Sequence, residues 1–448
     1  METIHILHTN DIHSHLENWP RVSRFLHEKQ RSYSEVVTFD IGDAIDRLHP
    51  LTDASMGWAN IELMNNCHYD GVTIGNNEGL VLSHEALNHL YDKANFDVLL
   101  ANLKELPNDS QPKWAQEYKI LTTGIGTKIG VLGLTAPYEL TYPPLGWQPH
   151  DVDDTLDRLL PIIREKSDVI VLLSHLGLPT DERLAKKYDI DVILGAHTHH
   201  LLPHGKVINQ TILAGAGRYG ENIGDVTLTM EDHKIIDQAA RTTPVYELPE
   251  SVDDFNLIKG WLNAGRHELE SQHVAVLPRT IGTDEQAYDA LRALKRFYQV
   301  PAALVSTGMF VEDLPEGELS RYELLESMPH AINPMLITLT GTQIKNLMIS
   351  IEKQTAELAN FPMKGSGFRG KVFGYMRFDG IDRQQDGQIL YHGENLIMDQ
   401  SYQIATLDHY KWIPFFPIIA DAPSEIALNI ILRELMADYY TDKYNKDN

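Results

Sequence analysis

The chain has 448 residues, which exceeds one ordinary hydrophobic core and predicts two or three domains of roughly 100 to 200 residues each. Its 38 basic and 63 acidic side chains give a formal net charge of -25, which argues against general binding to nucleic acid or to anionic membranes. The single cysteine, Cys67, excludes an internal disulfide framework.

The first half of the chain alternates short apolar runs with segments of helical periodicity, which predicts a layered α/β domain. We expect strands at residues 4–7, 36–39, 71–74, 98–101, 128–134, 169–173, 192–194, 211–214 and 224–230. We expect helices at residues 21–30, 59–66, 83–94, 153–166 and 181–188. Ser83 is a suitable N-cap for the third of these helices.

Residues 244–273 predict a helical connector, because apolar residues recur at helical spacing from Phe255 to Leu262. The remaining residues, 274–448, predict a smaller α+β domain. Its expected helices lie at residues 287–298, 321–326, 341–353 and 423–440, and its expected strands at 302–306, 335–340, 372–378 and 402–406.

Five apolar runs in the first half lead into residue types that bind metal ions. In chain order these residues are Asp11 and His13, then Asp43, Asn76 and His175, and finally His197 and His199. Sheets of α/β proteins usually place a site at the carboxyl ends of their strands, so we expect these side chains to meet. Carboxylate and imidazole ligands suit ions such as Mn, Fe, Zn or Co. The sequence therefore predicts a two-metal centre.

Residues 1 to about 240 resemble the calcineurin-like metallophosphatase fold, whose pattern is D-x-H, G-D, G-N-H-E, H and G-H-x-H in that order. With a second domain after a linker, the chain resembles the 5'-nucleotidase and 2',3'-cyclic phosphodiesterase family, including H-T-N-D at residues 8–11. The resemblance implies a two-domain protein: a layered α/β metallophosphatase sandwich at 1–243, the connector at 244–273, and an α+β domain of the 5'-nucleotidase C-terminal type at 274–448.

The resemblance also implies roles for the seven metal-binding candidates. The first of two divalent ions is bound by Asp11, His13 and His199, and the second by Asn76, His175 and His197, while Asp43 bridges the pair. A bridging carboxylate of this kind holds two cations about 3.5 to 4 Å apart. The ions (Mn, Zn, Fe or Co) then activate a bridging hydroxide for direct attack on phosphorus, without a covalent phospho-enzyme.

Two positions near the proposed metal ligands depart from the family pattern. Where the family has a histidine over the leaving group, this chain has Asn77, and the aspartate that holds that histidine is replaced by Leu80. Asparagine donates a hydrogen bond but cannot deliver a proton. Loss of general-acid help costs about 10² to 10⁴ in rate for a poor leaving group. His84, a few residues further on, is an alternative proton donor.

In the second domain, the candidates for substrate binding are two aromatic rings and one cation. Phe368 and Phe416 are candidates for stacking on a nucleotide base, a contact worth roughly 1 to 3 kcal/mol, and Arg369 for contact with a phosphate. The alternative is that these aromatic side chains only pack in the core and that the arginine is solvated.

These features lead us to expect a cytoplasmic, metal-dependent hydrolase of phosphate esters of nucleotides. The cytoplasmic assignment depends on a start without a basic or apolar leader pattern and on the lack of any apolar run near 18 residues. The expected partner is a small-molecule nucleotide or phosphoester, not a nucleic-acid polymer or a membrane, and the oligomeric state is open. The alternatives are a phosphodiesterase or pyrophosphohydrolase acting on nucleotide sugars or nucleoside polyphosphates, and a nucleotide sensor of low activity.

Overall fold

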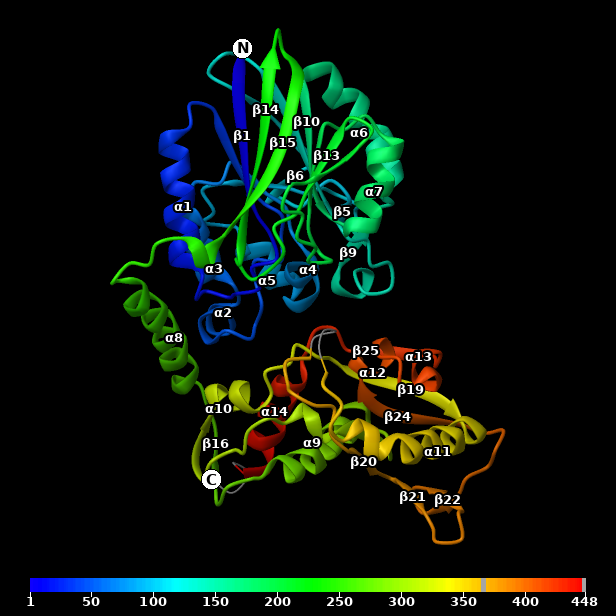
Figure 1. Cartoon of the computed structure of the whole chain (residues 1–448). Helices are drawn as coiled ribbons and strands as arrows, with labels where there is room; N and C mark the ends of the chain where they lie inside the picture. Colours follow the sequence, from blue (N-terminus) through cyan, green and yellow to red (C-terminus); the bar gives the residue numbers. More distant parts are fainter. Residues whose placement is uncertain (364–367, 445–448) are drawn as a thin grey trace. The chain divides into compact units, whose positions relative to one another are not determined.

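The computed structural model describes residues 1–363 and 368–444. The chain divides into two compact units, Met1–Gly265 and Arg266–Asn448 (Figure 1). The division falls within one helix, α8 (Asp254–Ser271). Each unit has its own hydrophobic core.

The first unit contains two large β-sheets. The seven-stranded sheet has the order β15-β14-β1-β2-β3-β4-β6. Its strands are β1 (Glu2–Thr9), β2 (Val36–Asp40), β3 (Gly71–Val72), β4 (Asp97–Leu99), β6 (Ala115–Gln116), β14 (Asn222–Glu231) and β15 (Lys234–Pro244). The six-stranded sheet has the order β12-β13-β11-β10-β8-β7. Its strands are β7 (Tyr118–Thr122), β8 (Lys128–Thr135), β10 (Val169–His175), β11 (Val192–Gly195), β12 (Lys206–Ile208) and β13 (Thr211–Ala214). A further strand pair joins β5 (Leu103–Glu105) to β9 (Trp147–Pro149).

The main core of this unit lies between the two sheets. Ile4 and Phe39 from the first sheet join the same buried cluster as Val171 and Leu194 from the second. Strand β10 is buried along its whole length, as expected of a central parallel strand covered on both faces. The predicted α/β sandwich is therefore present.

Helices flank the two sheets (Figure 1). Helices α6 (Val152–Lys166) and α7 (Leu178–Lys187) pack in a second buried cluster with β10 of the six-stranded sheet, and α1 (Trp19–Ser32) contacts β2 of the seven-stranded sheet. The shorter helices are α2 (Pro50–Ser55), α3 (Trp58–Asn65), α4 (Asn76–Val81) and α5 (His84–Leu90). The Ser83 hydroxyl accepts a hydrogen bond from the Ala86 amide at 3.1 Å, which confirms Ser83 as the N-cap of α5.

The second unit is built on a five-stranded sheet of order β20-β17-β24-β19-β25. Its strands are β17 (Ala303–Ser306), β19 (Pro334–Thr340), β20 (Met376–Asp379), β24 (Ser401–Leu407) and β25 (Ser424–Ile426). The smaller sheets contain β16 (His273–Leu277), β18 (Gly317–Ser320), β21 (Ile381–Arg383), β22 (Ile389–Tyr391) and β23 (Glu394–Asn395). The helices are α9 (Thr283–Tyr298), α10 (Arg321–Ser327), α11 (Gly341–Leu358), α12 (His409–Trp412), α13 (Pro417–Ala420) and α14 (Leu432–Tyr444).

Two predicted elements of the second unit begin several residues later than expected. The helix expected at 423–440 begins only at Leu432, because Ser424–Ile426 adds an edge strand to β19, with Ile337 opposite Ser424. The strand expected at 372–378 begins only at Met376, where pairing with β17 starts. At residues 424–426, cross-strand pairing with β19 overrides the local helical pattern. At residues 372–375, Gly374 has a φ of 79°, which interrupts the extended chain before the pairing with β17 begins.

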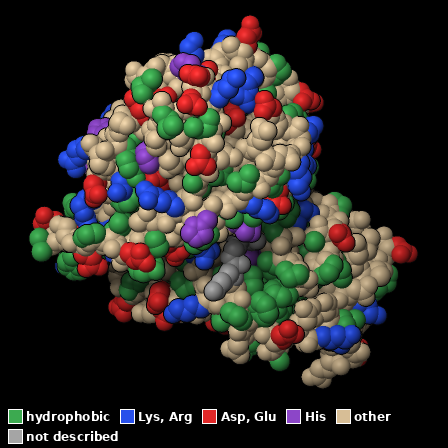
Figure 2. Space-filling view, turned by 45° about the horizontal axis from the view of Figure 1, so that its top comes forward, with side chains coloured by type: hydrophobic (Ala, Val, Ile, Leu, Met, Phe, Trp, Pro, Cys, Tyr) green, Lys and Arg blue, Asp and Glu red, His purple; other side chains and the backbone are tan. Residues whose placement is uncertain are grey.

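Two further observations concern the charge distribution on the surface and the composition of the helices. On the face shown in Figure 2, Lys and Arg side chains are interspersed with Asp and Glu. Within residues 1–363 and 368–444, no helix combines the length and the apolar composition needed to cross a membrane.

Candidate metal centre

Strands from both sheets of the first unit end at the same site. In the seven-stranded sheet, β1, β2 and β3 run parallel, and the segments after them carry Asp11, His13, Asp43 and Asn76. In the six-stranded sheet, β10 and β11 run parallel, so that His175 ends one strand and His197 and His199 follow the other. Parallel strands bring their carboxyl ends together, and the sandwich brings the two sets face to face.

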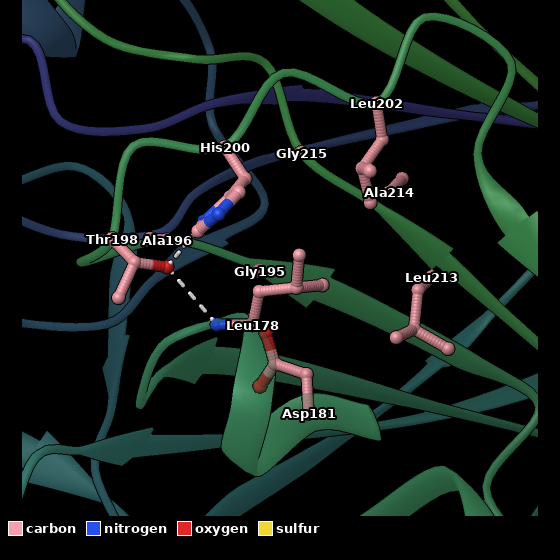
Figure 3. Close-up of a pocket in the computed structure, with 10 residues that line it drawn as sticks. All are labelled: Leu178, Asp181, Gly195, Ala196, Thr198, His200, Leu202, Leu213, Ala214 and Gly215. Atoms are coloured by element: carbon pink, nitrogen blue, oxygen red, sulfur yellow. Dashed lines mark hydrogen bonds between the residues drawn. The ribbon is translucent and has the colours of Figure 1, made fainter.

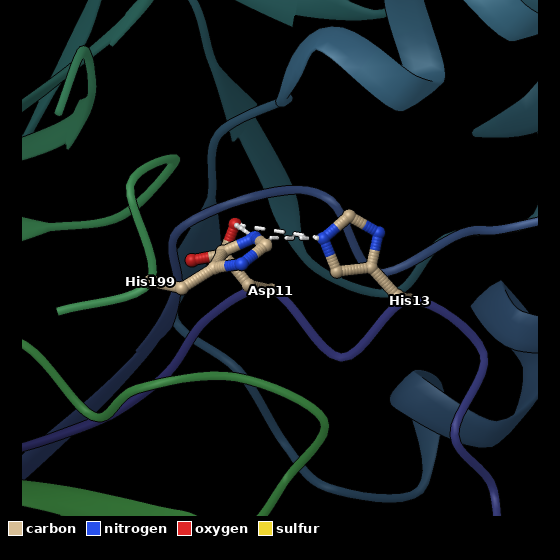
Figure 4. Close-up of side chains that lie close together, drawn as sticks. All are labelled: Asp11, His13 and His199. Carbon is tan, nitrogen blue, oxygen red and sulfur yellow. Dashed lines mark hydrogen bonds and ion pairs between the residues drawn. The ribbon is translucent and has the colours of Figure 1, made fainter. Parts of the chain in front are cut away.

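One group of side chains consists of Asp11, His13 and His199, which point toward one another (Figure 4). The Nε2 atoms of the two histidines are 3.1 Å apart. Nε2 of His199 lies 3.4 Å from Oδ1 of Asp11, and Nε2 of His13 lies 3.8 Å from the same oxygen. Three atoms able to bind a metal ion therefore surround one small volume.

A second group consists of Asp11, Asp43 and His175. Oδ2 of Asp43 lies 3.4 Å from Nε2 of His175 and 3.6 Å from Nε2 of His13. The other oxygen of Asp43 accepts a hydrogen bond from the Asn77 amide at 2.7 Å. The carboxylate of Asp43 thus lies between histidines contributed by the two different sheets.

Asn76 and His197 complete the cluster. Oδ1 of Asn76 is 2.8 Å from Nδ1 of His197, and the His197 amide lies 3.2 Å from both oxygens of Asp11. The structure therefore brings together all seven side chains that the sequence singled out as metal-binding candidates. The phenol of Tyr138, which the sequence did not single out, lies 3.3 Å from Nε2 of His197.

The donor set and its burial fit divalent cations. Asp11 and His175 are fully buried, and within residues 1–363 and 368–444 Nε2 of His175 forms no hydrogen bond, although it lies 3.4 Å from Oδ2 of Asp43. Burial disfavours charge on His175, but the adjacent Asp43 carboxylate raises the pKa of the imidazole to about 10. Burial likewise disfavours ionised Asp43, but His175 and then His13 hold the pKa of its carboxyl well below the usual range. A metal ion at this point would replace the imidazole proton as the partner of the carboxylate.

The backbone at the cluster is strained. Asp11, His13, Asp43, His197 and His199 all have positive φ, between 49° and 73°. Non-glycine residues seldom adopt this conformation, which costs of order 1 to 3 kcal/mol at each position and concentrates at functional sites. The strand ends are therefore shaped to aim these side chains inward.

The carboxylate of Glu78 supports the loops at the centre. It is buried and accepts hydrogen bonds from the amides of Asp43 at 3.0 Å, Ile45 at 3.1 Å and Gly75 at 2.8 Å. Glu78 thus ties the loop after β2 to the loop after β3. The sequence placed this residue in a motif but gave it no role.

The two predicted catalytic candidates lie in different surroundings. Nδ2 of Asn77 donates to the Ile45 carbonyl at 3.0 Å and lies 3.0 Å from Nδ1 of His13. His84 instead packs against Trp147, with its Nε2 3.7 Å from Glu105. Within the described part of the chain, no hydrogen bond, ion pair or ring contact joins His84 to the seven-residue cluster.

The second-unit candidates lie in and beside a hydrophobic core. Phe368 and Phe416 are 3% and 1% exposed, so neither ring offers an open face for a nucleotide base. The Phe368 ring instead stacks on His330 at 4.7 Å and on His409 at 5.4 Å. The Arg369 amide donates to Nδ1 of His330 at 2.8 Å. The alternative of core packing therefore describes both phenylalanines in this structure.

A small hollow lies beside the turn that carries His197 (Figure 3). Leu178, Asp181, Thr198 and His200 are among the residues that line it, and the Thr198 hydroxyl accepts a hydrogen bond there from the Leu178 amide. Its volume of about 10 Å³ accommodates about one water molecule. This hollow is too small for a nucleotide.

Comparison with known proteins agrees with this arrangement. Residues 4–201 match the calcineurin-like phosphoesterase family, and residues 283–411 match the 5'-nucleotidase C-terminal domain. The metallophosphoesterase YunD of Bacillus subtilis (strain 168), described as uncharacterized, is 35% identical over 460 residues, spanning 97% of this chain and 98% of YunD. The trifunctional nucleotide phosphoesterase protein YfkN of the same organism is 26% identical over 397 residues, spanning 77% of this chain and 27% of YfkN.

Solved structures share the fold. The NAD nucleotidase of Haemophilus influenzae has a TM-score of 0.67 at 16% identity, with 98% of this chain and 96% of that chain covered. A 5'-nucleotidase precursor from Thermus thermophilus has a TM-score of 0.60 at 17% identity, with 98% of this chain and 96% of that chain covered. The family matches at residues 4–201 and 283–411 and the 35% identity to YunD show that the chain belongs to the calcineurin-like metallophosphoesterase family, with a C-terminal domain of the 5'-nucleotidase type, and is a phosphoester hydrolase.

Proposed function

We propose that this chain hydrolyses phosphate esters of nucleotides with two divalent metal ions. The observation that carries the proposal is the convergence of seven oxygen and nitrogen ligands from two sheets on one site, whose two aspartates and His175 are buried. The proposed first set is Asp11, His13 and His199, and the proposed second set is Asn76, His175 and His197, with Asp43 shared. Two such ions activate water at neutral pH and neutralise charge on phosphoryl oxygens.

The protein's own residues hold and orient these ligands. Nδ1 of His175 lies 2.7 Å from the Ile41 carbonyl, which fixes the ring so that Nε2 faces Asp43. The Asn77 amide anchors one oxygen of Asp43 and leaves the other facing the histidines. Burial excludes bulk water from the carboxylates, which strengthens their attraction for cations.

The surroundings of Asn77 favour a second candidate activity, hydrolysis of phosphoanhydride bonds in nucleotide sugars or nucleoside polyphosphates. Its side-chain amide is occupied by the Ile45 carbonyl and by His13, and it holds no acidic proton. A phosphate leaving group is already acidic and needs less protonation than the 5'-oxygen of a nucleoside. Both activities use the same metal site and differ only in the leaving group.

Metal reconstitution tests the proposed function. Protein stripped with chelator and then loaded with Mn, Zn, Co or Fe is assayed on a nucleoside monophosphate, a 2',3'-cyclic nucleotide, a nucleotide sugar and a nucleoside triphosphate. We expect metal-dependent hydrolysis that Asp43→Asn reduces at least about 10³-fold, because several kcal/mol of charge stabilisation is lost. The matched control is Asp237→Asn, which changes an exposed carboxylate on β15. Bound metal without turnover of any of these substrates would support the nucleotide sensor instead.

A comparison of leaving groups separates the two candidate activities. If the lack of a general acid at Asn77 limits the reaction, the nucleotide sugar is hydrolysed about 10²- to 10⁴-fold faster than the monophosphate. His84→Ala leaves both rates unchanged if His84 takes no part, as its contacts with Trp147 and Glu105 suggest. A selective fall in monophosphate hydrolysis in His84→Ala would make His84 the proton donor.

A further inference from the structure

We propose that Arg218 is a phosphate-binding residue at the rim of the metal centre, presented by the ring of Tyr219. The proposal rests on the proposed function, because it adds a protein side chain to the metal ions as a binding partner of the substrate's phosphate. Arg218 lies in the turn after β13 and is exposed, whereas Tyr219 beside it is half-buried. The ligand is a phosphoryl group, carried by the ester or released as inorganic phosphate.

Tyr219 places this turn next to the metal-binding candidates. Its amide donates a hydrogen bond to the Asp11 carbonyl at 2.7 Å. The centroid of its ring lies 5.9 Å from that of His13 and 6.3 Å from that of His199. The guanidinium carbon of Arg218 lies 4.5 Å from the same ring centroid. The Tyr219 ring therefore contacts the Arg218 guanidinium and lies near the rings of two proposed metal ligands, while the His15 ring stacks on it at 3.8 Å.

Within this turn, Tyr219 is held in a conformation that its own side chain disfavours. Gly217, Tyr219 and Gly220 have φ values of 79°, 61° and 62°. Glycine adopts such values readily, but a bulky aromatic residue does so rarely and only where its surroundings impose it. Strain of this kind, next to a metal site, points to a positioned side chain.

Asparagine side chains impose that conformation. Asn10 donates to the Gly217 carbonyl at 2.7 Å and accepts from the Ala216 amide at 3.0 Å. Nδ2 of Asn10 also donates to Oδ2 of Asp11 at 2.8 Å, and Asn18 donates to the Tyr219 carbonyl at 2.9 Å. The Asn10 side chain thus braces both the turn and a proposed metal ligand, which fixes their relative position.

The guanidinium of Arg218 is available to an anion. Among the described residues it forms no hydrogen bond or ion pair and stacks on the Tyr219 ring, although the chain carries 63 acidic side chains. By contrast, Arg266, which stacks on Tyr322 at 4.9 Å, also forms an ion pair with Glu270 at 2.7 Å. Stacking on a ring restrains an arginine but leaves its planar fork of N–H donors open to phosphate oxygens.

The test measures binding of inorganic phosphate and the kinetics of hydrolysis in Arg218→Gln, Arg218→Lys and Arg266→Gln. In the Mn-loaded protein, we expect Arg218→Gln to raise both KM and the inhibition constant for phosphate by about 10- to 100-fold, with a smaller change in kcat. Lysine keeps the charge but not the fork, so Arg218→Lys should recover part of the loss. Arg266→Gln should match the parent.

A second readout does not depend on turnover. We expect phosphate to raise the thermal midpoint of the parent and of Arg266→Gln, and to raise that of Arg218→Gln less at equal Mn content. If Arg218→Gln and Arg266→Gln agree in KM, in phosphate inhibition and in thermal shift, the inference fails while the proposed function stands. If the Mn-loaded parent hydrolyses no phosphoester, the proposed function fails, and the phosphate shift still decides the role of Arg218.

Discussion

Glu78 holds two loops of the metal centre with a single buried carboxylate. Its oxygens accept three backbone amides, and one of these belongs to Asp43. Replacement by glutamine removes one acceptor and introduces an N–H group that faces amide donors, so the loop after β2 must shift. Side chains that orient metal ligands commonly contribute about 10- to 100-fold to metal affinity.

We therefore expect Glu78→Gln to weaken Mn binding by about 10- to 100-fold, as measured by calorimetric titration of the metal-free protein. The control is Glu85→Gln, since Glu85 is exposed in the first turn of α5. Equal Mn affinity in the two variants would show that Glu78 does not position Asp43.

His330 makes the stability of the second unit depend on pH. Burial, followed by the nearby charges of His409, Arg369 and Arg433, lowers the pKa of its imidazole to about 3, from an ordinary value near 6.5. Between these values the unfolded chain binds a proton that the folded protein does not. The free energy of unfolding therefore falls as the pH drops below about 6.5, by up to about 1.4 kcal/mol per pH unit.

Glutamine at position 330 can still accept the Arg369 amide but does not titrate. Between about pH 7.5 and pH 5, we expect His330→Gln to lose about 2 kcal/mol less unfolding free energy than the parent, measured by urea denaturation. His267→Gln, at an exposed position of α8, should keep the slope of the parent. If the free energy of unfolding of His330→Gln depends on pH as steeply as that of the parent, His330 is not the source of the pH dependence.

At the scale of elements, the loop between β3 and α4 reaches the metal centre only because Gly75 lacks a side chain. A Cβ atom at Gly75 would lie 2.0 Å from Oδ1 of Asp43 and 2.5 Å from Cε1 of His175. Neither group is free to move, because Asp43 is held by the Asn77 amide and His175 is fully buried. The loop and the two proposed ligands therefore share one tightly packed space.

We expect Gly75→Ala to reduce metal-dependent hydrolysis at least about 10-fold, with a matching loss of bound Mn, because the methyl group displaces Asp43. The contrasting variant is Gly260→Ala in α8, where an added Cβ would meet no atom within 4 Å. That change should stabilise the helix by up to about 1 kcal/mol and leave hydrolysis unchanged. Full activity in Gly75→Ala would show that the loop can shift to accommodate the methyl group without displacing Asp43.

At the scale of the whole molecule, the seven proposed metal ligands belong to the first unit, between residues 11 and 199. The second unit has a separate core and contributes none of them. A ligand that binds only the folded state stabilises it by about 2.7 kcal/mol at about 100 times its Kd. Metal should therefore stabilise one unit selectively.

Differential scanning calorimetry with Mn and with chelator measures this effect. We expect Mn to raise the unfolding temperature of the first unit and to leave the second-unit transition in place, with the shift abolished in Asp43→Asn. Separate expression of each unit assigns the two transitions. A single transition that shifts as a whole would mean that the two units unfold as one cooperative body, and an equal shift of two separate transitions would contradict selective stabilisation of the first unit.

The sequence identified the α/β character of the first unit and its metal-binding candidates, because both are local properties. Alternating strands and helices leave a periodic pattern, and ligands that follow strand ends appear beside apolar runs such as Val169–Leu173. The short strands were harder to predict. The local sequence of residues 424–426 predicts a helix, but these residues form a strand because they pair with the edge of β19.

Tertiary structure alone decided which distant side chains share a contact. No pattern in the sequence joins Tyr219 to Asp11, or Glu78 to the amide of Asp43, since these contacts arise from loops packed against one another. It also decided that Phe368 lies in a core, because local composition does not distinguish a buried ring from one exposed to a ligand. The sequence by itself thus determined which groups follow the strands, and packing determined what each of them faces, because orientation depends on neighbours remote in the chain.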